Sequence, residues 1–293
     1  MLRRTENDCG IRKLIRSAIV SALVLSFLLI YRALATAEEP AELTPEQRAA
    51  HLDRMRAIAR SVKVFDVVDE SRAPVQIVDE PVLRYTDNTR KLYDSTIWIW
   101  GNSGRPSAIM AIEYYPQRPR EPKWLFEIAS LSAGKIAAES GKELRWTARE
   151  PGLRLKPLAD PSSPADKPNV RLAQMKKLQQ RFGAYERAPI GDRIELRPLA
   201  RPLHRYHDES AGALDGAVFA FANGTNPEVL WIIESRQDEK AGSHWQFGLV
   251  QMTGAEVFVQ LDGKEIWKQG EADPPTERDS YVNGWLAPAA DTN

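Results

Sequence analysis

Residues 81–113 read PVLRYTDNTRKLYDSTIWIWGNSGRPSAIMAIE, and residues 202–234 read PLHRYHDESAGALDGAVFAFANGTNPEVLWIIE. The two stretches align without a gap at a constant offset of 121 residues. Both contain the motif Arg-Tyr-x-Asp, called RYxD below. Its residues are Arg84, Tyr85 and Asp87 in the first copy and Arg205, Tyr206 and Asp208 in the second. This likeness predicts an internal duplication.

The match extends beyond these stretches through tryptophan. At the same offset, Trp124 corresponds to Trp245 and Trp146 corresponds to Trp267. Tryptophan is scarce in proteins, so two such matches rarely arise by chance. Each copy is therefore expected to be a module of about a hundred residues.

Each module is predicted to begin with a helix. In the first copy, Thr44-Pro45-Glu46-Gln47 offers an N-cap hydroxyl, a proline at the first helical position and a glutamine that completes a capping box. Apolar residues follow at steps of three and four, which predicts one apolar stripe that packs on a sheet. They are Leu52, Met55, Ile58, Ala59 and Val62, and in the second copy Leu172, Met175, Leu178 and Phe182.

Strands are predicted to follow the helix. Trp98 and Trp100 share one face of the strand at 95–100, and the second copy keeps aromatic residues there as Phe219 and Phe221. That face is therefore predicted to be core. The opposite face changes size between the copies, so we expect it to be packed differently or partly exposed. It holds Ile97 and Ile99 in the first copy and Val218 and Ala220 in the second.

These patterns predict an α+β fold of two tandem homologous modules. Each would be one amphipathic helix followed by a roughly six-stranded antiparallel sheet, and the two would pack as a pseudo-dimer. The expected boundaries are 1–37 for a targeting segment, 44–150 for the first module, 151–168 for a proline-rich linker, 169–272 for the second module and 273–293 for a polar tail.

Residues 1–37 are typical of a secretory signal. A basic start precedes an apolar run at 18–31, and Ala35-Thr36-Ala37 supplies small residues for cleavage. The alternative is an uncleaved membrane anchor, although a spanning helix needs about 18 or more apolar residues. Either way we expect an exported protein, periplasmic or extracellular, that touches a membrane only through this segment. Cys9 is the only cysteine, so cleavage would leave no disulfide and no thiol.

Composition and motifs exclude several function classes. The chain has 40 basic and 40 acidic side chains, which gives no electrostatic footprint for nucleic acid. It contains no GxSxG, GxGxxG, HExxH or CxxC motif and no phosphate-binding loop. The sequence therefore predicts no catalytic residue, no cofactor and no metal, and leaves a protein or a small molecule as the partner.

The RYxD motifs are the clearest polar candidates for binding. Together with Asp94 and Asp215 they could line a ligand cleft between the modules. The other interpretation is a turn in which the aspartate accepts backbone N–H groups and the arginine pairs with it. A single site rarely needs duplicate parts, so the turn is the favoured interpretation.

Three further groups have two interpretations each. Glu113 and Glu234 end matching strands and could form an acid/base pair, or they could simply pair with basic side chains. His204 and His207, with Asp208, have a spacing that a metal could use. Residues three apart on a strand face opposite ways, however, which argues against that site. Finally, Trp231 and Trp285 lack aromatic counterparts and are candidates for surface platforms.

The motifs RYxD, LDG, FAF, GTNPEVLWIIE and WQF, with RLxQM before them, resemble exported bacterial proteins of unknown function associated with planctomycetes. The similarity spans Leu52 to Trp267. It implies a recurring extracytoplasmic domain and brings no activity, ligand or site residue with it. The helix-then-curved-sheet unit also resembles cystatin-like folds, by fold analogy alone.

Three functions fit this sequence. The favoured one is a non-catalytic extracytoplasmic binding or scaffolding protein whose ligand surface is the groove between the modules or an open sheet face. The second is a carrier of an apolar ligand in a cavity between the helix and its curved sheet. The third is a hydrolase that uses the strand-end glutamates or the histidine cluster.

Overall fold

The computed structural model describes residues 43–286, with gaps at 88, 102, 117, 119–122, 143, 160–161, 188–190, 239–241 and 275. The expected targeting segment at 1–37 lies outside the described residues, as does the end of the expected tail. Within the described part, no helix has the length and apolar character that crossing a membrane requires.

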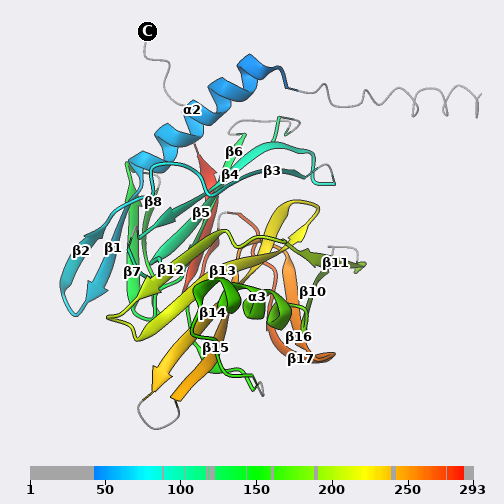
Figure 1. Cartoon of the computed structure of the whole chain (residues 1–293). Coiled ribbons are helices and arrows are strands. Elements are labelled where there is room, and N and C mark those ends of the chain that lie inside the picture. The colour runs from blue at the N-terminus through cyan, green and yellow to red at the C-terminus, as the bar shows by residue number, and fades with distance from the viewer. Residues whose placement is uncertain are drawn as a thin grey trace, which may run out of the picture. The chain divides into compact units, whose positions relative to one another are not determined.

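The described residues form two helices and nineteen strands (Figure 1). In the first half these are α2 (Pro45–Ser61), β1 (Lys63–Val68), β2 (Ser71–Val75), β3 (Leu83–Asp87), β4 (Leu92–Trp100), β5 (Ala108–Tyr114), β6 (Trp124–Ser130), β7 (Lys135–Ser140), β8 (Leu144–Thr147) and β9 (Lys156–Pro157). In the second half they are α3 (Pro168–Gln179), β10 (Phe182–Arg187), β11 (Arg193–Pro198), β12 (His204–Asp208), β13 (Ala213–Asn223), β14 (Asn226–Asp238), β15 (Gly242–Gln251), β16 (Glu256–Leu261), β17 (Lys264–Gln269), β18 (Thr276–Glu277) and β19 (Tyr281–Leu286).

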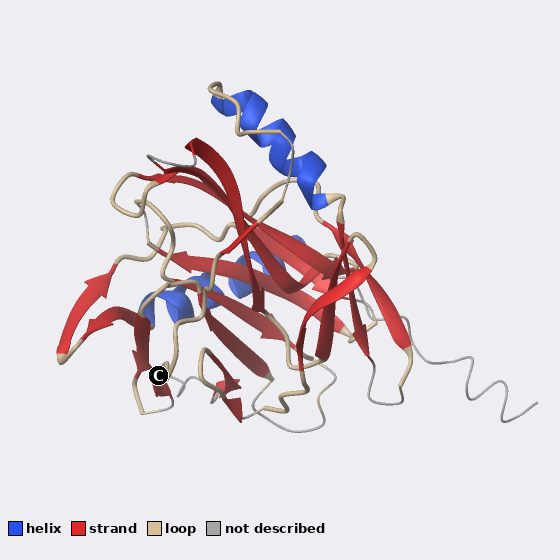
Figure 2. Cartoon of the chain, turned by 90° about the horizontal axis from the view of Figure 1, so that it is seen from below, coloured by secondary structure: helices blue, strands red, loops and turns tan. Residues whose placement is uncertain are grey.

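The fold is α+β with antiparallel sheets, and the two helices lie against the strands (Figure 2). The first half contributes a four-stranded sheet in the order β2-β1-β7-β8 and most of a six-stranded sheet in the order β3-β4-β5-β6-β19-β18. The second half forms one nine-stranded sheet in the order β17-β16-β10-β11-β13-β14-β15-β9, with β12 also paired to β13. The order β11-β10-β16-β17 repeats β2-β1-β7-β8, and β12-β13-β14-β15 repeats β3-β4-β5-β6.

Helix α2 begins as the sequence predicts. The Thr44 side chain accepts from the Gln47 amide at 3.2 Å, and the Thr44 amide donates to Gln47 Oε1 at 2.9 Å. The capping box is therefore confirmed. Met55 and Ala59 on the apolar stripe are fully buried. In α3, Met175 and Leu178 play the same part.

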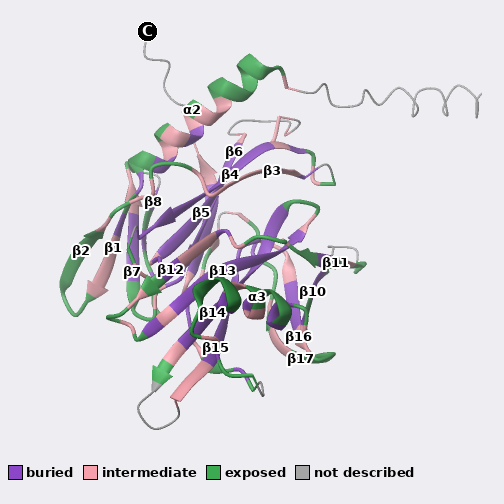
Figure 3. Ribbon diagram, in the orientation of Figure 1, coloured by how far each residue is buried: buried purple, intermediate pink, exposed green. Residues whose placement is uncertain are grey.

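One face of the central strands packs against the helices, as predicted. Trp98 and Trp100 belong to the same buried cluster as Met55 of α2. In the second half, Phe219 and Phe221 share a cluster with Met175 of α3. The core face is confirmed in both halves, and these strands are buried along most of their length (Figure 3).

The expectation that Trp231 is a surface platform is wrong. Trp231 is 0% exposed, and its ring lies 5.0 Å from that of Phe182 and 5.5 Å from that of Phe219. Its position corresponds to Met110, which is also fully buried, so the position is apolar core in both halves even though only one residue is aromatic.

The opposite face of the central strands is also buried. Ile97 and Ile99 of β4 are fully buried, as are Val218 and Ala220 of β13. All four belong to one cluster that draws on both halves, so the two central sheets share this core. Of the two expectations for this face, partial exposure is therefore wrong, and packing different from that of the helix-covered face is confirmed. The residue sizes differ between the halves because this core is shared rather than repeated.

The last strand of each half joins the sheet of the other half. Strand β9 follows β8 in the chain but pairs with β15, whereas β18 and β19 follow β17 and join the sheet of β6, with which β19 pairs. We call this the strand exchange. Two expected boundaries need correction as a result. The expected polar tail at 273–293 contains β18 and β19, and the expected linker at 151–168 contains β9 and the start of α3.

The physical reason is that both segments bury apolar side chains despite their prolines. Leu153 and Leu158 flank β9 and are almost fully buried, and so are Tyr281 and Val282 in β19. Each half also has more strands than the roughly six expected, because β2 and β11 carry few apolar residues and β9 and β18 are only two residues long.

Residues 261–264 form a tight hairpin turn. Asp262 and Gly263 both have positive φ, at 50° and 78°, and they connect β16 to β17. Positive φ at both central residues is the conformation for which Asp-Gly is favoured in a two-residue turn.

The strand exchange depends on a close approach at Gly152, just before β9. A Cβ at this residue would lie 2.0 Å from the Ser130 carbonyl oxygen, which is main chain and cannot turn aside. We expect Gly152→Ala to lower the free energy of unfolding by about 2 kcal/mol or more, as overpacking does. In Gly183→Ala the new Cβ would meet only Gln260 Oε1 at 3.9 Å, and the change should be near zero. Urea unfolding measures both; equal effects would contradict this account of the exchange.

Candidate functional site

The arginine of each RYxD motif joins its strand to the start of a helix. Arg84 Nε lies 2.7 Å from Asp94 Oδ1, and Arg84 Nη2 lies 2.5 Å from Asp94 Oδ2 and 2.6 Å from the Arg48 carbonyl oxygen. In the second half, the equivalent distances join Arg205 to Asp215 at 2.9 and 2.6 Å and to the Pro168 carbonyl at 2.5 Å. The arginines therefore pair with Asp94 and Asp215, not with the motif aspartates that the turn interpretation assigned to them.

A side chain from each helix completes these pairs. His51 Nδ1 of α2 lies 3.3 Å from Asp94 Oδ2, and Arg171 Nε of α3 donates to Asp215 Oδ2 at 2.9 Å. Burial lowers the pKa of His51 below its usual value, against the opposing charge of Asp94. The two aspartates are buried and serve the helix–sheet contact in both halves.

The tyrosine of each motif donates to the strand-end glutamate of its own half. The hydroxyl–Oε1 distance is 2.8 Å from Tyr85 to Glu113 and 2.8 Å from Tyr206 to Glu234. Burial raises the pKa of both tyrosines well above the usual value, so they remain neutral donors. The second oxygen of Glu113 accepts from Tyr115 at 2.8 Å. The glutamates are thus committed to donors within the protein.

The aspartate of each motif caps a turn, as the favoured interpretation expects. Asp87 Oδ1 accepts from the Arg90 amide at 3.1 Å, and Asp208 Oδ1 accepts from the Ala211 amide at 3.0 Å. Both aspartates also face the other half. Asp208 Oδ2 accepts from the Arg105 amide at 3.0 Å, and Asp87 Oδ2 lies 3.5 Å from Asn226 Nδ2.

The hairpin turn of each half therefore lies on the RYxD motif of the other half. Arg105 also donates from Nε to Glu234 Oε1 at 2.6 Å and from Nη2 to Oε2 at 2.9 Å. From the other side, the Thr225 hydroxyl donates to the Thr86 carbonyl at 2.8 Å. The motif residues are brought together at the contact between the halves, and they do not line the large cleft described below. Asp208 alone among the six lines a described cavity, of about 310 Å³.

A group of buried carboxylates surrounds Arg90 at the same contact. Arg90 donates to Asp87 at 2.9 Å, to Glu186 at 2.5 Å and to Glu228. Burial raises the pKa of Glu228 to about 8, with Arg90 opposing the shift and Glu186 adding to it. Burial and the charge of Glu113 likewise raise the pKa of Glu127 well above its usual range. With a pKa of about 8, Glu228 keeps at neutral pH a proton that an isolated carboxylate would release.

The histidines do not share a metal site. His204 stacks on Tyr206 with ring centroids 6.1 Å apart, whereas His207 Nδ1 bonds to the Leu214 carbonyl at 2.8 Å. Across the described ranges, no group of three or more His, Cys, Asp or Glu side chains is arranged to hold a metal ion.

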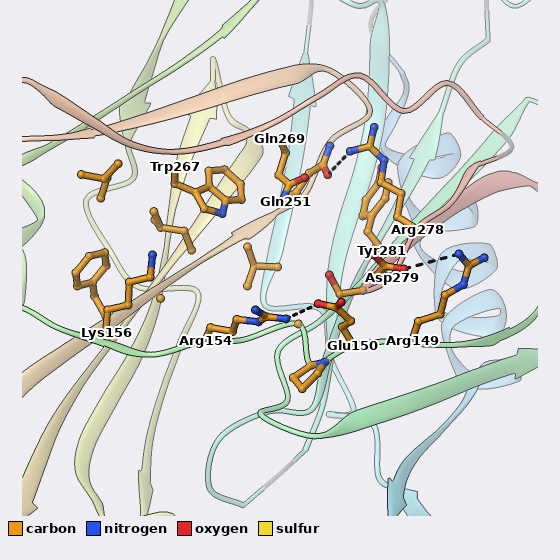
Figure 4. Close-up of a pocket in the computed structure, with 18 of the residues that line it drawn as sticks. Arg149, Glu150, Arg154, Lys156, Gln251, Trp267, Gln269, Arg278, Asp279 and Tyr281 are labelled. Atoms are coloured by element: carbon orange, nitrogen blue, oxygen red, sulfur yellow. Dashed lines mark hydrogen bonds and ion pairs between the residues drawn. The ribbon is translucent and has the colours of Figure 1, made fainter.

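The larger of two cavities on the described residues is a cleft of about 900 Å³ (Figure 4). It lies between residues 149–157, strands β15 to β17 and residues 277–281. Because β9 and β17 are the two edges of the nine-stranded sheet and both line the cleft, that sheet curls until its edges face each other. The floor is apolar and is formed by Phe247, Leu249, Leu261, Ile266 and Trp267. The charged rim includes Arg149, Glu150, Arg154, Lys156, Arg278 and Asp279.

The corresponding place in the first half is closed by main chain. There, Trp146 Nε1 donates to the Arg278 carbonyl at 3.3 Å, and the Arg149 amide donates to the Asp279 carbonyl at 2.8 Å. Trp267 is the counterpart of Trp146, but its Nε1 bonds to no residue in the described part of the chain. Residues 150–152 are the segment that would close the equivalent gap beside Trp267. They stay with the first half instead, where the Leu153 amide donates to the Ser132 carbonyl at 3.0 Å.

Sequence reasoning missed the cleft because two of its walls come from the expected linker and tail. The sequence does contain one sign of these walls, which is the equivalence of two short segments. Residues 153–158 (LRLKPL) and 281–286 (YVNGWL) hold equivalent places, since Lys156 pairs with Phe247 and Gly284 pairs with Phe126. The likeness of these short segments is too slight to recognise without the strand pairing.

Comparisons with known proteins give no relative from which a role could be transferred. No family model, no curated protein and no solved structure matches this chain. What the cleft can do chemically is therefore set by the side chains that line it.

Arg105 provides a test of the contact between the halves. Its side chain is 11% exposed and Glu234 is 0% exposed, so Arg105→Met would leave a buried carboxylate with fewer donors. We expect the free energy of unfolding to fall by about 3 kcal/mol. Arg56→Met, which breaks pairs to the exposed Asp53 and Glu80, should cost less than about 1 kcal/mol. Denaturant unfolding compares the two, and a small effect of Arg105→Met would show that Tyr206 and Arg236 suffice for Glu234.

The raised pKa of Glu228 predicts how stability depends on pH. The folded state keeps a proton that the unfolded state releases above its ordinary value of 4.5, so this contribution is complete below that pH and is lost as pH rises through about 8. One proton changes the free energy of unfolding by at most about 1.4 kcal/mol per pH unit. Glu228→Gln should therefore lose stability less steeply than wild type across this range. Urea unfolding at several pH values tests this, and identical slopes would contradict it.

Proposed function

We propose that the protein is a non-catalytic binding protein that acts outside the cytoplasm, with the cleft as its ligand site. The observation that carries this proposal is that the gap beside Trp267 is open, whereas the equivalent gap beside Trp146 is closed by main chain. The apolar floor is buried or half-buried, and a concave site lined by apolar side chains with a few polar groups is typical of a ligand pocket. The volume of about 900 Å³ also lies within the usual range for small-molecule sites.

The proposed architecture is an internal pseudo-dimer that arose by tandem duplication. Three observations support it: the strand order repeats, the RYxD contacts repeat, and the hairpin turn of each half lies on the motif of the other. In this proposal Arg84, Tyr85, Asp87, Arg205, Tyr206 and Asp208 hold the two modules together. The cleft exists because the modules differ here: main chain covers Trp146 in the first module, but no described main chain covers Trp267 in the second. Export would depend on residues 1–37, as expected for the exported proteins that the motifs resemble.

The geometry favours this proposal over the two alternatives. A carrier with its ligand between helix and sheet would need space beneath α3, but Met175, Phe219 and Trp231 fill that region and are 0% exposed. A hydrolase built on Glu113 and Glu234 would need carboxylates that reach a cleft. Both are buried and bonded within the protein, and neither lines the cleft.

A neutral fluorescent probe tests the cleft. N-phenyl-1-naphthylamine is apolar, carries no charge and brightens when it leaves water. We expect one saturable site on the wild-type chain. Leu249→Trp adds bulk to the floor at a half-buried position, so it should weaken binding at least about tenfold, because an occupied floor excludes the probe.

Val170→Trp is the matched control, because Val170 is 41% exposed on α3 and does not line the cleft. It should leave the affinity unchanged. Absence of saturable binding to wild type, or equal binding by the Leu249→Trp variant, would refute the cleft as the site.

A further inference from the structure

We propose that the ligand of the cleft is an amphipathic anion: an apolar ring or chain on the floor, with one acidic group held by Lys156 and Trp267. This inference rests on the proposed function and adds to it the chemical class of the ligand.

The charge of the rim supports an anion. Arg149 pairs with Asp279 at 3.8 Å, Arg154 pairs with Glu150, and Arg278 donates to Gln251 Oε1 at 3.4 Å and to the Glu271 carbonyl. Lys156 differs from these cations, because it forms no ion pair with any residue that the structure describes. The third lining carboxylate, Glu277, is an exposed side chain on the two-residue strand β18.

The position of Lys156 places its charge beside the apolar floor. Lys156 is the cross-strand partner of Phe247, so the two side chains leave the sheet on the same face. Figure 4 shows Lys156 and Trp267 on one side of the cleft, and the ion pairs Arg154–Glu150 and Arg149–Asp279 toward the other. A ligand that reaches Lys156 therefore also meets the floor.

Trp267 supplies the second donor. In the first half, the equivalent indole N–H of Trp146 is satisfied by a carbonyl oxygen, that of Arg278. The first half thus shows that the indole N–H at this position donates to an oxygen atom. An indole N–H and an ammonium group can only donate, so an oxygen that carries negative charge satisfies both.

The floor determines the chemical character of the rest of the ligand. Phe247 belongs to the buried core of the second half, and Leu249, Ile266 and Trp267 pack against that core. Apart from the Trp267 indole N–H, the side chains of the described floor residues are apolar. They offer a ligand no hydrogen-bond acceptor. The ligand is therefore apolar over most of its length and acidic at one end.

Two probes that differ by one sulfonate separate the acidic group from the apolar body. 8-Anilino-1-naphthalenesulfonate is N-phenyl-1-naphthylamine with one sulfonate added. We expect Lys156→Met to weaken the sulfonate probe about tenfold or more and to change the neutral probe by less than twofold, because a charge-assisted hydrogen bond is lost. Trp267→Phe keeps a ring but removes the N–H, and it should act in the same direction. Lys156→Arg should restore the affinity.

Lys264→Met is the matched control, because Lys264 is an exposed lysine on β17 that does not line the cleft. It should leave both probes unchanged. If the neutral probe binds but Lys156→Met leaves the sulfonate probe unaffected, or weakens both probes equally, the anionic class is wrong and the cleft remains a site. If the neutral probe does not bind wild type, the proposed function itself fails.

Discussion

The apolar core shared by the two central sheets is the constraint on which the rest of the structure depends. Ile97 and Ile99 from one half, and Val218 and Ala220 from the other, belong to it and are fully buried. Because these strands are also covered by a helix on their other face, each central sheet is buried on both sides, as a middle layer must be. The helices then lie outermost, and the apolar sequence of the central strands follows from this layering.

The polar residues at the border of that core decide how the halves fit together. Arg105 reaches Glu234, and Arg90 reaches Glu186, each across the contact between the halves. Burying such pairs gives little net stability, because desolvation offsets most of the Coulomb attraction. Leaving one partner without the other is far more costly. Most of the stability of the contact therefore comes from the shared core, while a shifted alignment of the two sheets would separate these charges from their partners.

Part of this structure can be predicted from the sequence. The capping box at Thr44, the aromatic core face of β4 and the turn at Asp262 are local patterns, and local physics fixes them. Alternation shows that Ile97 and Ile99 share a face, but it does not show what covers that face. Strand β9 is only two residues long, β19 follows a polar, proline-containing stretch, and the partners of both lie far away in the chain. The cleft depends on those partners, so it could not be predicted.

The strand exchange has a consequence for how the protein is made. Strand β19 follows the other described strands in the chain, yet it covers the edge of β6 near the beginning. During synthesis that edge stays bare while the whole second half emerges from the ribosome, and bare edges are prone to join neighbouring chains. Folding of the first half is thereby tied to arrival of the last strand. A translocating chain, delivered start first across a membrane, would meet the same delay on the far side.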